Sequence, residues 1–260
     1  MKVLALDFDG VIADSAPESF VVAVYTYASM RPGSSIDRVR DRVDQSSVVE
    51  LKGNSAYVRF VDLMPLGNRA EDFGVALSIL DAGLEIRDQR GYDDVRSCAG
   101  SEFLAEFHER FYRERRNLRS ADPVRWTGLL GPYPRFVEIL KRRGNETILA
   151  LATAKDRDSA TWLLDDYGLS DLIPDERVVD KQAGADKRAH LRVLCERLGV
   201  ELREITFIDD KVNHLDAVAP LGVRCGLAAW GYNGERERAQ ARRRGYLVCT
   251  LDDVETQVFG

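Results

Sequence analysis

Long apolar runs are missing from this chain, and their absence excludes several classes of protein at once. No stretch approaches the ~20 consecutive apolar residues that a membrane-spanning helix requires. The opening MKVLAL is shorter than the apolar core of about 7–15 residues found in secretory signal peptides. We therefore expect a cytoplasmic protein that does not associate with a membrane.

Cysteine and histidine are also scarce. The four cysteines are scattered along the chain without a C-x-x-C pair: Cys98, Cys195, Cys225 and Cys249. This spacing indicates reduced, mostly buried thiols, with neither a disulfide framework nor a zinc site. The three histidines are equally scattered: His108, His190 and His214. Without a close pair they argue against a metal site built from histidine.

An excess of basic charge is missing as well. The 37 Lys and Arg residues against 43 Asp and Glu residues leave a net charge of −6. A general nucleic-acid binder needs a basic surface to displace phosphate counterions, so that class is disfavoured. The run RRR at 242–244 is interpreted as a solvated helix face. With 260 residues, the chain can form one large domain or two modest ones with a real core.

What the sequence does contain is a series of short apolar runs separated by helical stretches. Continuous runs of this kind are typical of strands buried on both faces of a parallel sheet. Strands that alternate with helices predict right-handed crossovers and a doubly wound, Rossmann-like α/β fold. The expected strands lie at 2–7, 147–153, 176–180, 204–210, 223–228 and 246–250.

Two of the intervening helices carry clear end signals. The first starts near Pro134 and stops at Gly144, because proline suits a first helical turn and glycine suits a helix end. The second is expected to have Asp186 as its N-cap and Gly199 as its stop. The first helix therefore precedes the expected strand at 147–153, and the second lies between the expected strands at 176–180 and 204–210.

The segment 16–130 differs from the rest because it shows helical periodicity and almost no strand signal. Ser15-Ala16-Pro17-Glu18 fits a capping box at its start. Two apolar stripes recur at helical spacing and are interpreted as core: Phe73, Leu77, Leu80 and Leu84, and Phe103, Phe107 and Phe111. We therefore predict an α/β core at 1–15 and 131–260 with a helical domain inserted at 16–130.

Carboxylates gather where two of the expected strands end. Asp7 and Asp9 project to the same side of a strand, and Gly10 then allows a sharp turn. Asp209 and Asp210 end another strand. Because ligands bind where the carboxyl ends of neighbouring strands meet, these aspartates predict an oxygen-rich pocket for Mg²⁺. The alternative is that each aspartate simply caps a helix, but capping does not require doubled carboxylates.

The sequence resembles the haloacid dehalogenase superfamily, specifically its phosphatase branch. DFDGVIADS (7–15) is similar to the first signature of that branch, D-x-D-G-[VT]-x-x-D-S. The other signatures follow in order: ILALAT ending at Thr153, Lys187 opening a later helix, and FIDD ending at Asp210. Segment 16–130 carries no signature of the family. It resembles the cap of phosphoglycolate-phosphatase-like members only in its position in the chain and in its helical character.

The resemblance implies a mechanism. Asp7 would attack the phosphorus as nucleophile and form an aspartyl-phosphate, and Asp9 would serve as general acid and base. Mg²⁺ would be held by Asp7, by the Asp9 main-chain carbonyl and by Asp210, while Thr153 and Lys187 would hold the phosphoryl oxygens.

Further contacts are implied less directly. Gly10, Ala154 and Lys155 are assigned to substrate binding, although Lys155 could equally be solvated. Asp209 would either ligate the metal or support it from behind. Lys181 competes with Lys187 for the phosphate, because it directly follows an expected strand.

The expected activity is Mg²⁺-dependent hydrolysis of a small phosphorylated metabolite by a monomer or homodimer. Asp9 separates the chain from dehalogenases and phosphonatases, which lack an aspartate there, and Lys52 is the only lysine at 16–130. A phosphoryl-transferring mutase of the β-phosphoglucomutase type remains an alternative. So does a non-catalytic binding relative, although the intact set of signature residues argues against it.

Overall fold

The computed structural model describes residues 2–184 and 186–260. The chain divides into two compact units. One unit comprises Met1–Asp14 and Pro132–Gly260, and the other comprises Ser15–Gly131. The two short strands β2 (Ala13–Asp14) and β3 (Gly131–Pro132) pair where the chain passes from one unit to the other.

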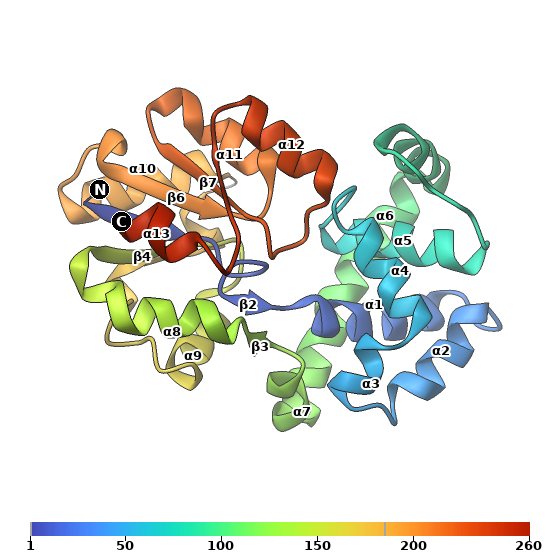
Figure 1. Ribbon diagram of the computed structural model, residues 1–260. Coiled ribbons are helices and arrows are strands. Elements are labelled where there is room, and N and C mark those ends of the chain that lie inside the picture. The colour runs from blue at the N-terminus through green and yellow to red at the C-terminus, as the bar shows by residue number, and fades with distance from the viewer. Residues whose placement is uncertain (1, 185) are drawn as a thin grey trace. The chain divides into compact units, whose positions relative to one another are not determined.

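A parallel sheet forms the centre of the first unit, as predicted (Figure 1). Within the described residues it has six strands in the order β5-β4-β1-β6-β7-β8. Their bounds are β1 (Val3–Leu6), β4 (Ile148–Ala152), β5 (Val178–Val179), β6 (Ile205–Asp209), β7 (Arg224–Ala228) and β8 (Leu247–Cys249). The order reverses direction at β1, which lies between β4 and β6, so the carboxyl ends of these central strands form the switch point.

Helices cover both faces of this sheet, which explains why its strands are largely apolar. In Figure 1, α10, α11 and α12 lie on one face, and α8, α9 and α13 lie on the other. Their bounds are α8 (Pro134–Arg143), α9 (Arg157–Asp166), α10 (Lys187–Leu198), α11 (Val212–Val218), α12 (Glu235–Arg243) and α13 (Val254–Phe259). The side chains of β1, from Val3 to Leu6, are completely buried.

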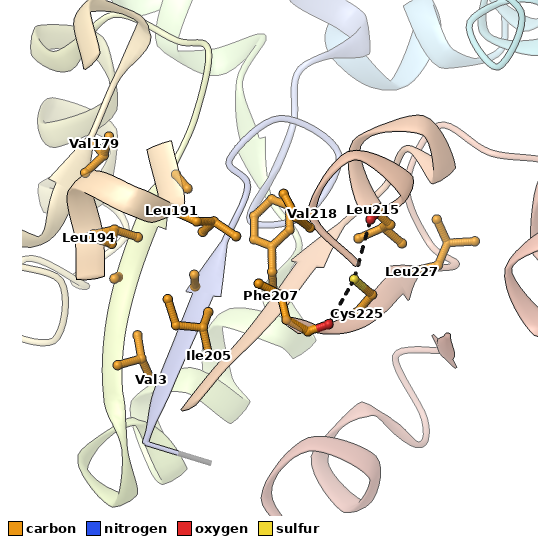
Figure 2. Close-up of a cluster of buried hydrophobic side chains, with 14 of the residues drawn as sticks. Val3, Val179, Leu191, Leu194, Ile205, Phe207, Leu215, Val218, Cys225 and Leu227 are labelled. Carbon is orange, nitrogen blue, oxygen red and sulfur yellow. Dashed lines mark hydrogen bonds between the residues drawn. The ribbon is translucent and has the colours of Figure 1, made fainter. Parts of the chain in front are cut away.

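One face of the sheet packs against α10 and α11 to form a continuous core (Figure 2). Leu191 and Leu194 of α10 approach the sheet together with Leu215 of α11, and all three are fully buried. Phe207, in the middle of β6, is also fully buried. Each such side chain contributes about 1.5–3 kcal/mol by burial, so this cluster holds β6 and the two helices in register.

The predicted ends of α10 are confirmed. The Asp186 side chain accepts a hydrogen bond from the Ala189 N–H at 3.0 Å, as an N-cap does. At the other end, Gly199 adopts a left-handed conformation with φ of +61°, which a glycine takes without a Cβ penalty. The cap fixes where α10 begins, and therefore where its first residue, Lys187, is held.

The second unit is helical, again as predicted. Its helices are α1 (Ala16–Met30), α2 (Ser35–Val43), α3 (Val48–Lys52), α4 (Ser55–Leu63), α5 (Ala70–Asp81), α6 (Gln89–Ala121) and α7 (Pro123–Gly128). Aromatic rings form its core, with ring centroids 5.2 Å apart between Phe20 and Phe60 and 5.5 Å apart between Phe73 and Phe111. Leu84 departs from the predicted stripe, because α5 ends at Asp81 and Leu84 is 43% exposed.

The predicted capping box at Ser15 and Glu18 is wrong. The Ser15 side chain makes no capping hydrogen bond to α1. Glu18 is buried and instead accepts two hydrogen bonds from the Arg115 guanidinium, both at 2.6 Å. A bidentate, charge-assisted pair is stronger than a bond to one backbone N–H, so the distant arginine takes the carboxylate away from the helix end.

A membrane span is not found in the part of the chain that the structure describes. Over residues 2–184 and 186–260, no helix combines the length and the apolar character needed to cross a bilayer.

Candidate active site

Asp7 lies directly after β1, at the switch point of the sheet. Its N–H still donates to the Ile208 carbonyl of β6 at 2.9 Å, so the sheet ladder fixes its backbone. The residue is 7% exposed, and its Oδ1 accepts a hydrogen bond from the Phe8 N–H at 2.8 Å. The side chain of Phe8 is completely buried. Successive side chains along a strand point to opposite faces, so Phe8 is buried in the core while the Asp7 carboxylate reaches the site.

Lys187 contacts this carboxylate directly. It is the first residue of α10 and is 4% exposed. Its Nζ lies 2.8 Å from Asp7 Oδ1, 2.8 Å from the Ala152 carbonyl oxygen and 3.4 Å from Asp209 Oδ2. The competing lysine, Lys181, is exposed. Of the two lysines considered from the sequence, Lys187 is therefore the one that reaches Asp7.

A second lysine reaches the other carboxylate of the first signature. Lys155 follows β4, and its Nζ donates to Asp9 Oδ1 at 3.0 Å. Its N–H donates to Thr153 Oγ1 at 3.1 Å, and Thr153 is 1% exposed. Ala154, between them, is exposed. The turn after β4 thus holds Thr153 close to the backbone of Lys155 while the Lys155 side chain reaches Asp9.

Asp209 and Asp210 are both fully buried, but they contact different groups. Asp209, the last residue of β6, lies beside Lys187. Asp210 Oδ2 accepts the Tyr232 N–H at 2.8 Å. A Cβ added at Gly10 would lie 2.6 Å from the same oxygen, and Gly10 has φ of +80°. Glycine is therefore required here both for the turn and for the close approach of Asp210.

His214 also contacts Asp209, and the sequence analysis did not single it out. Its Nδ1 lies 3.1 Å from Asp209 Oδ1 and 3.0 Å from Oδ2. Asp7, Asp209 and His214 each offer an atom that could ligate a metal, all within 4.8 Å of one another. The sequence did hold a signal for this contact, because His214 lies in the first turn of a helix that follows the strand ending at Asp209. Side chains in a first helical turn point back toward the end of the preceding strand.

Burial and charge shift the pKa values of these groups. Burial, reinforced by the charge of Asp209, raises the pKa of Asp7 to about 7 although Lys187 opposes the shift. Burial acts to raise the pKa of Asp209 too, but His214 and Lys187 outweigh it and lower that pKa below its usual range. For Lys187, burial is outweighed by the charges of Asp7 and Asp209, so its pKa is raised.

Asp210 is the group that a cation would relieve most directly. Burial raises its pKa, and the nearest ammonium, Lys211 Nζ, lies 3.9 Å away. A buried carboxylate in this state is costly unless a cation approaches it. Carboxylate and carbonyl oxygens, such as those that Asp7, Asp9 and Asp210 offer, are the ligands that a hard divalent ion such as Mg²⁺ prefers. The residues therefore fit the metal that the resemblance implies.

A family comparison agrees with this geometry. The family model described as haloacid dehalogenase-like hydrolase matches residues 1–222. The chain belongs to the haloacid dehalogenase-like hydrolases. No curated protein matches the chain.

Solved structures share the fold of this haloacid dehalogenase-like hydrolase. A predicted phosphoglycolate phosphatase from Haemophilus somnus aligns with a TM-score of 0.64 at 16% identity, over 98% of this chain and 96% of the other. A predicted phosphatase from Clostridium acetobutylicum gives 0.59 at 13%, over 99% and 98%. A haloacid dehalogenase-like hydrolase from Streptococcus pneumoniae gives 0.61 at 10%, over 99% and 98%.

Proposed function

We propose that this hydrolase cleaves phosphate monoesters of small metabolites with the help of Mg²⁺, through an aspartyl-phosphate on Asp7. The contact that carries the proposal is Lys187 Nζ at 2.8 Å from Asp7 Oδ1, at the switch point of the sheet. An ammonium beside a buried carboxylate supplies the positive charge that a transferring phosphoryl group needs. The net charge of −6 favours a small phosphorylated metabolite over nucleic acid as the partner.

Asp7 and Asp9 divide the reaction between them. Asp7 attacks the phosphorus, and the leaving oxygen takes a proton from Asp9. Asp9 then accepts a proton from the water that hydrolyses the aspartyl-phosphate, which regenerates Asp7. Lys155, with its Nζ 3.0 Å from Asp9 Oδ1, holds that side chain at the mouth of the site.

The phosphoryl group is held by the remaining residues. Thr153 Oγ1 binds its oxygens, and the Lys187 ammonium, held 2.8 Å from Asp7 Oδ1, balances part of their charge. Gly10 and Ala154 are the other residues that we assign to substrate binding. A Mg²⁺ ion held by Asp7, the Asp9 carbonyl and Asp210 would neutralise part of the charge of the phosphoryl group. Asp209 supports the site through Lys187, which it approaches to 3.4 Å.

Release of phosphate from an aryl phosphate tests the proposal. We expect Mg²⁺-dependent hydrolysis by the wild-type protein and a loss of at least about a thousandfold in Asp7→Asn, because the amide is not a nucleophile. Asp171→Asn is the matched control, since Asp171 is an exposed carboxylate of the same unit. Full activity in Asp7→Asn would show that Asp7 is not the nucleophile.

Trapping of the intermediate and a substrate screen extend the test. Mass spectrometry of the acid-quenched protein should find one phosphate on Asp7. Phosphoglycolate is the first compound to screen, because a solved relative at 16% identity is named a predicted phosphoglycolate phosphatase. Transfer of phosphate between two positions of a sugar, with little release, would instead identify a mutase.

A further inference from the structure

A chain of four side chains runs behind the proposed nucleophile: Asp7, Lys187, Asp209 and His214. An ammonium has three N–H donors, and Lys187 has three acceptors around it. Asp7 Oδ1 and the Ala152 carbonyl lie at 2.8 Å, and Asp209 Oδ2 lies at 3.4 Å. The direction of the Lys187 ammonium therefore depends on where the Asp209 carboxylate is held.

Two neighbours hold that carboxylate. Asp209 Oδ1 accepts the Lys211 N–H at 2.9 Å. His214 Nδ1 lies 3.0 Å and 3.1 Å from the two oxygens, so it constrains both ends of the carboxylate. Asp209 is completely buried, while the His214 side chain is 38% exposed. The histidine thus connects the buried Asp209 carboxylate with a partly exposed position in the first turn of α11.

We propose that His214 is a positioning residue, whose Nδ1–H fixes Asp209 so that Asp209 aims the Lys187 ammonium at Asp7. This inference rests on the proposed function, because Lys187 is useful there only if a phosphoryl group is transferred at Asp7. Among the described residues, the hydrogen-bond contacts of the His214 ring are with the two Asp209 oxygens, so the histidine acts through that carboxylate.

The alternative is that His214 ligates a metal together with Asp7 and Asp209, since the three offer atoms within 4.8 Å of one another. Lys187 argues against this arrangement. Its ammonium already lies 2.8 Å from Asp7 and 3.4 Å from Asp209. A divalent ion placed between the same two carboxylates would meet that positive charge at short range.

Three substitutions separate these possibilities. His214→Ala removes the donor. His214→Asn keeps an N–H at the position of Nδ1, because both nitrogens are bonded to Cγ. Asn213→Ala is the control for changes in α11, since Asn213 is exposed in the same helix. Rates with an aryl phosphate and Mg²⁺ are measured alongside Mn²⁺ affinity by electron paramagnetic resonance.

We expect kcat of His214→Ala to fall by about 10- to 100-fold, the effect of losing a hydrogen bond to a charged group. KM and Mn²⁺ affinity should stay near the wild-type values, His214→Asn should recover most of the rate, and Asn213→Ala should match the wild type. Equal kcat in His214→Ala and wild type would overturn the inference. So would a loss of Mn²⁺ affinity in His214→Ala comparable to its loss of rate, which would make His214 a ligand.

Orthovanadate binding, measured by calorimetry in the presence of Mg²⁺, separates this inference from the proposed function. An inactive wild-type protein would reject the hydrolase. The inference would still be tested, because weaker vanadate binding by His214→Ala than by His214→Asn is expected, and equal binding would overturn it. If His214→Ala does not fold, His214→Gln replaces it, since its amide lies one bond further from the backbone and should rescue less than His214→Asn.

Discussion

Asp7 of the α/β unit and Glu18 of the helical unit are both buried carboxylates, only eleven positions apart, yet their surroundings differ. Glu18 is saturated, because Arg115 binds both of its oxygens and Trp126 Nε1 lies 3.3 Å from one of them. Asp7 shares its cation, because Lys187 also contacts Asp209. The raised pKa of Asp7, about 7, reflects this incomplete compensation of its burial.

The difference separates a structural carboxylate from a reactive one. A buried carboxylate whose charge is balanced by a bidentate arginine attracts a further cation only weakly. A carboxylate whose charge is only partly balanced can still attract a cation and attack a phosphorus. Burial alone therefore does not distinguish a reactive carboxylate from a structural one. In this protein the distinguishing feature is that Asp7 shares its cation with a second carboxylate, Asp209.

The largest expected effect comes from removing Lys187, the cation that Asp7 and Asp209 share. Lys187→Met should reduce the rate of aryl phosphate hydrolysis by at least about a thousandfold, roughly 4 kcal/mol of transition-state stabilisation, because the positive charge near the phosphoryl group is lost. Steady-state kinetics measure this loss. Lys181→Met is the matched control, since Lys181 is exposed and is the other lysine that the sequence suggested. The reverse result, with Lys181→Met inactive and Lys187→Met active, would assign the phosphate-binding lysine to Lys181 instead.

A smaller effect is expected when the saturated pair is broken. Glu18→Gln should lower the free energy of unfolding by about 3 kcal/mol, because Arg115 loses its buried partner. Urea unfolding followed by circular dichroism measures the change. The double variant Glu18→Leu with Arg115→Met should recover most of the stability, since neither charge is then left alone. A double variant as unstable as Glu18→Gln would show that the pair contributes through something other than its charge.

The smallest effect concerns the thiols of the two units. Burial raises the pKa of Cys225 and of Cys249 to about 12, whereas Cys98 in the helical unit is exposed. A raised pKa leaves little thiolate at neutral pH, so alkylation of the two buried thiols should begin only as pH rises toward 12. Peptide mapping after iodoacetamide treatment at neutral pH should therefore find Cys98 modified first. Equal modification of Cys225 would mean that β7 opens readily.

The strands were predictable because each buried strand shows itself as a short apolar run in the local sequence. Every expected apolar run contains a strand of the sheet, from β1 at 3–6 to β8 at 247–249. A strand that is covered on both faces is mostly apolar, and this pattern can be recognised without knowing which strands lie beside it. The same holds for the ends of α10, where Asp186 and Gly199 act through their own backbone.

Contacts between distant parts of the chain were not predictable in this way. Glu18 has the spacing of a capping box, but Arg115 competes for it from 97 positions away. Leu84 has the spacing of a core residue, but α5 ends before it. His214 is a different case, because it lies only five positions after Asp209. Its contact follows from its place in the first turn of α11 directly after β6, so the local sequence already held the signal for it.

By itself, the sequence determined the α/β class, the helical insertion and the residues from which a phosphate site could be built, because hydrophobic period, turn residues and short signatures act over a few positions. Tertiary structure alone decided which lysine meets Asp7, how Asp209 and Asp210 divide their contacts, and which partner binds Glu18. Those outcomes depend on distances across the fold, and a charge is paired by whichever partner the packing brings within reach.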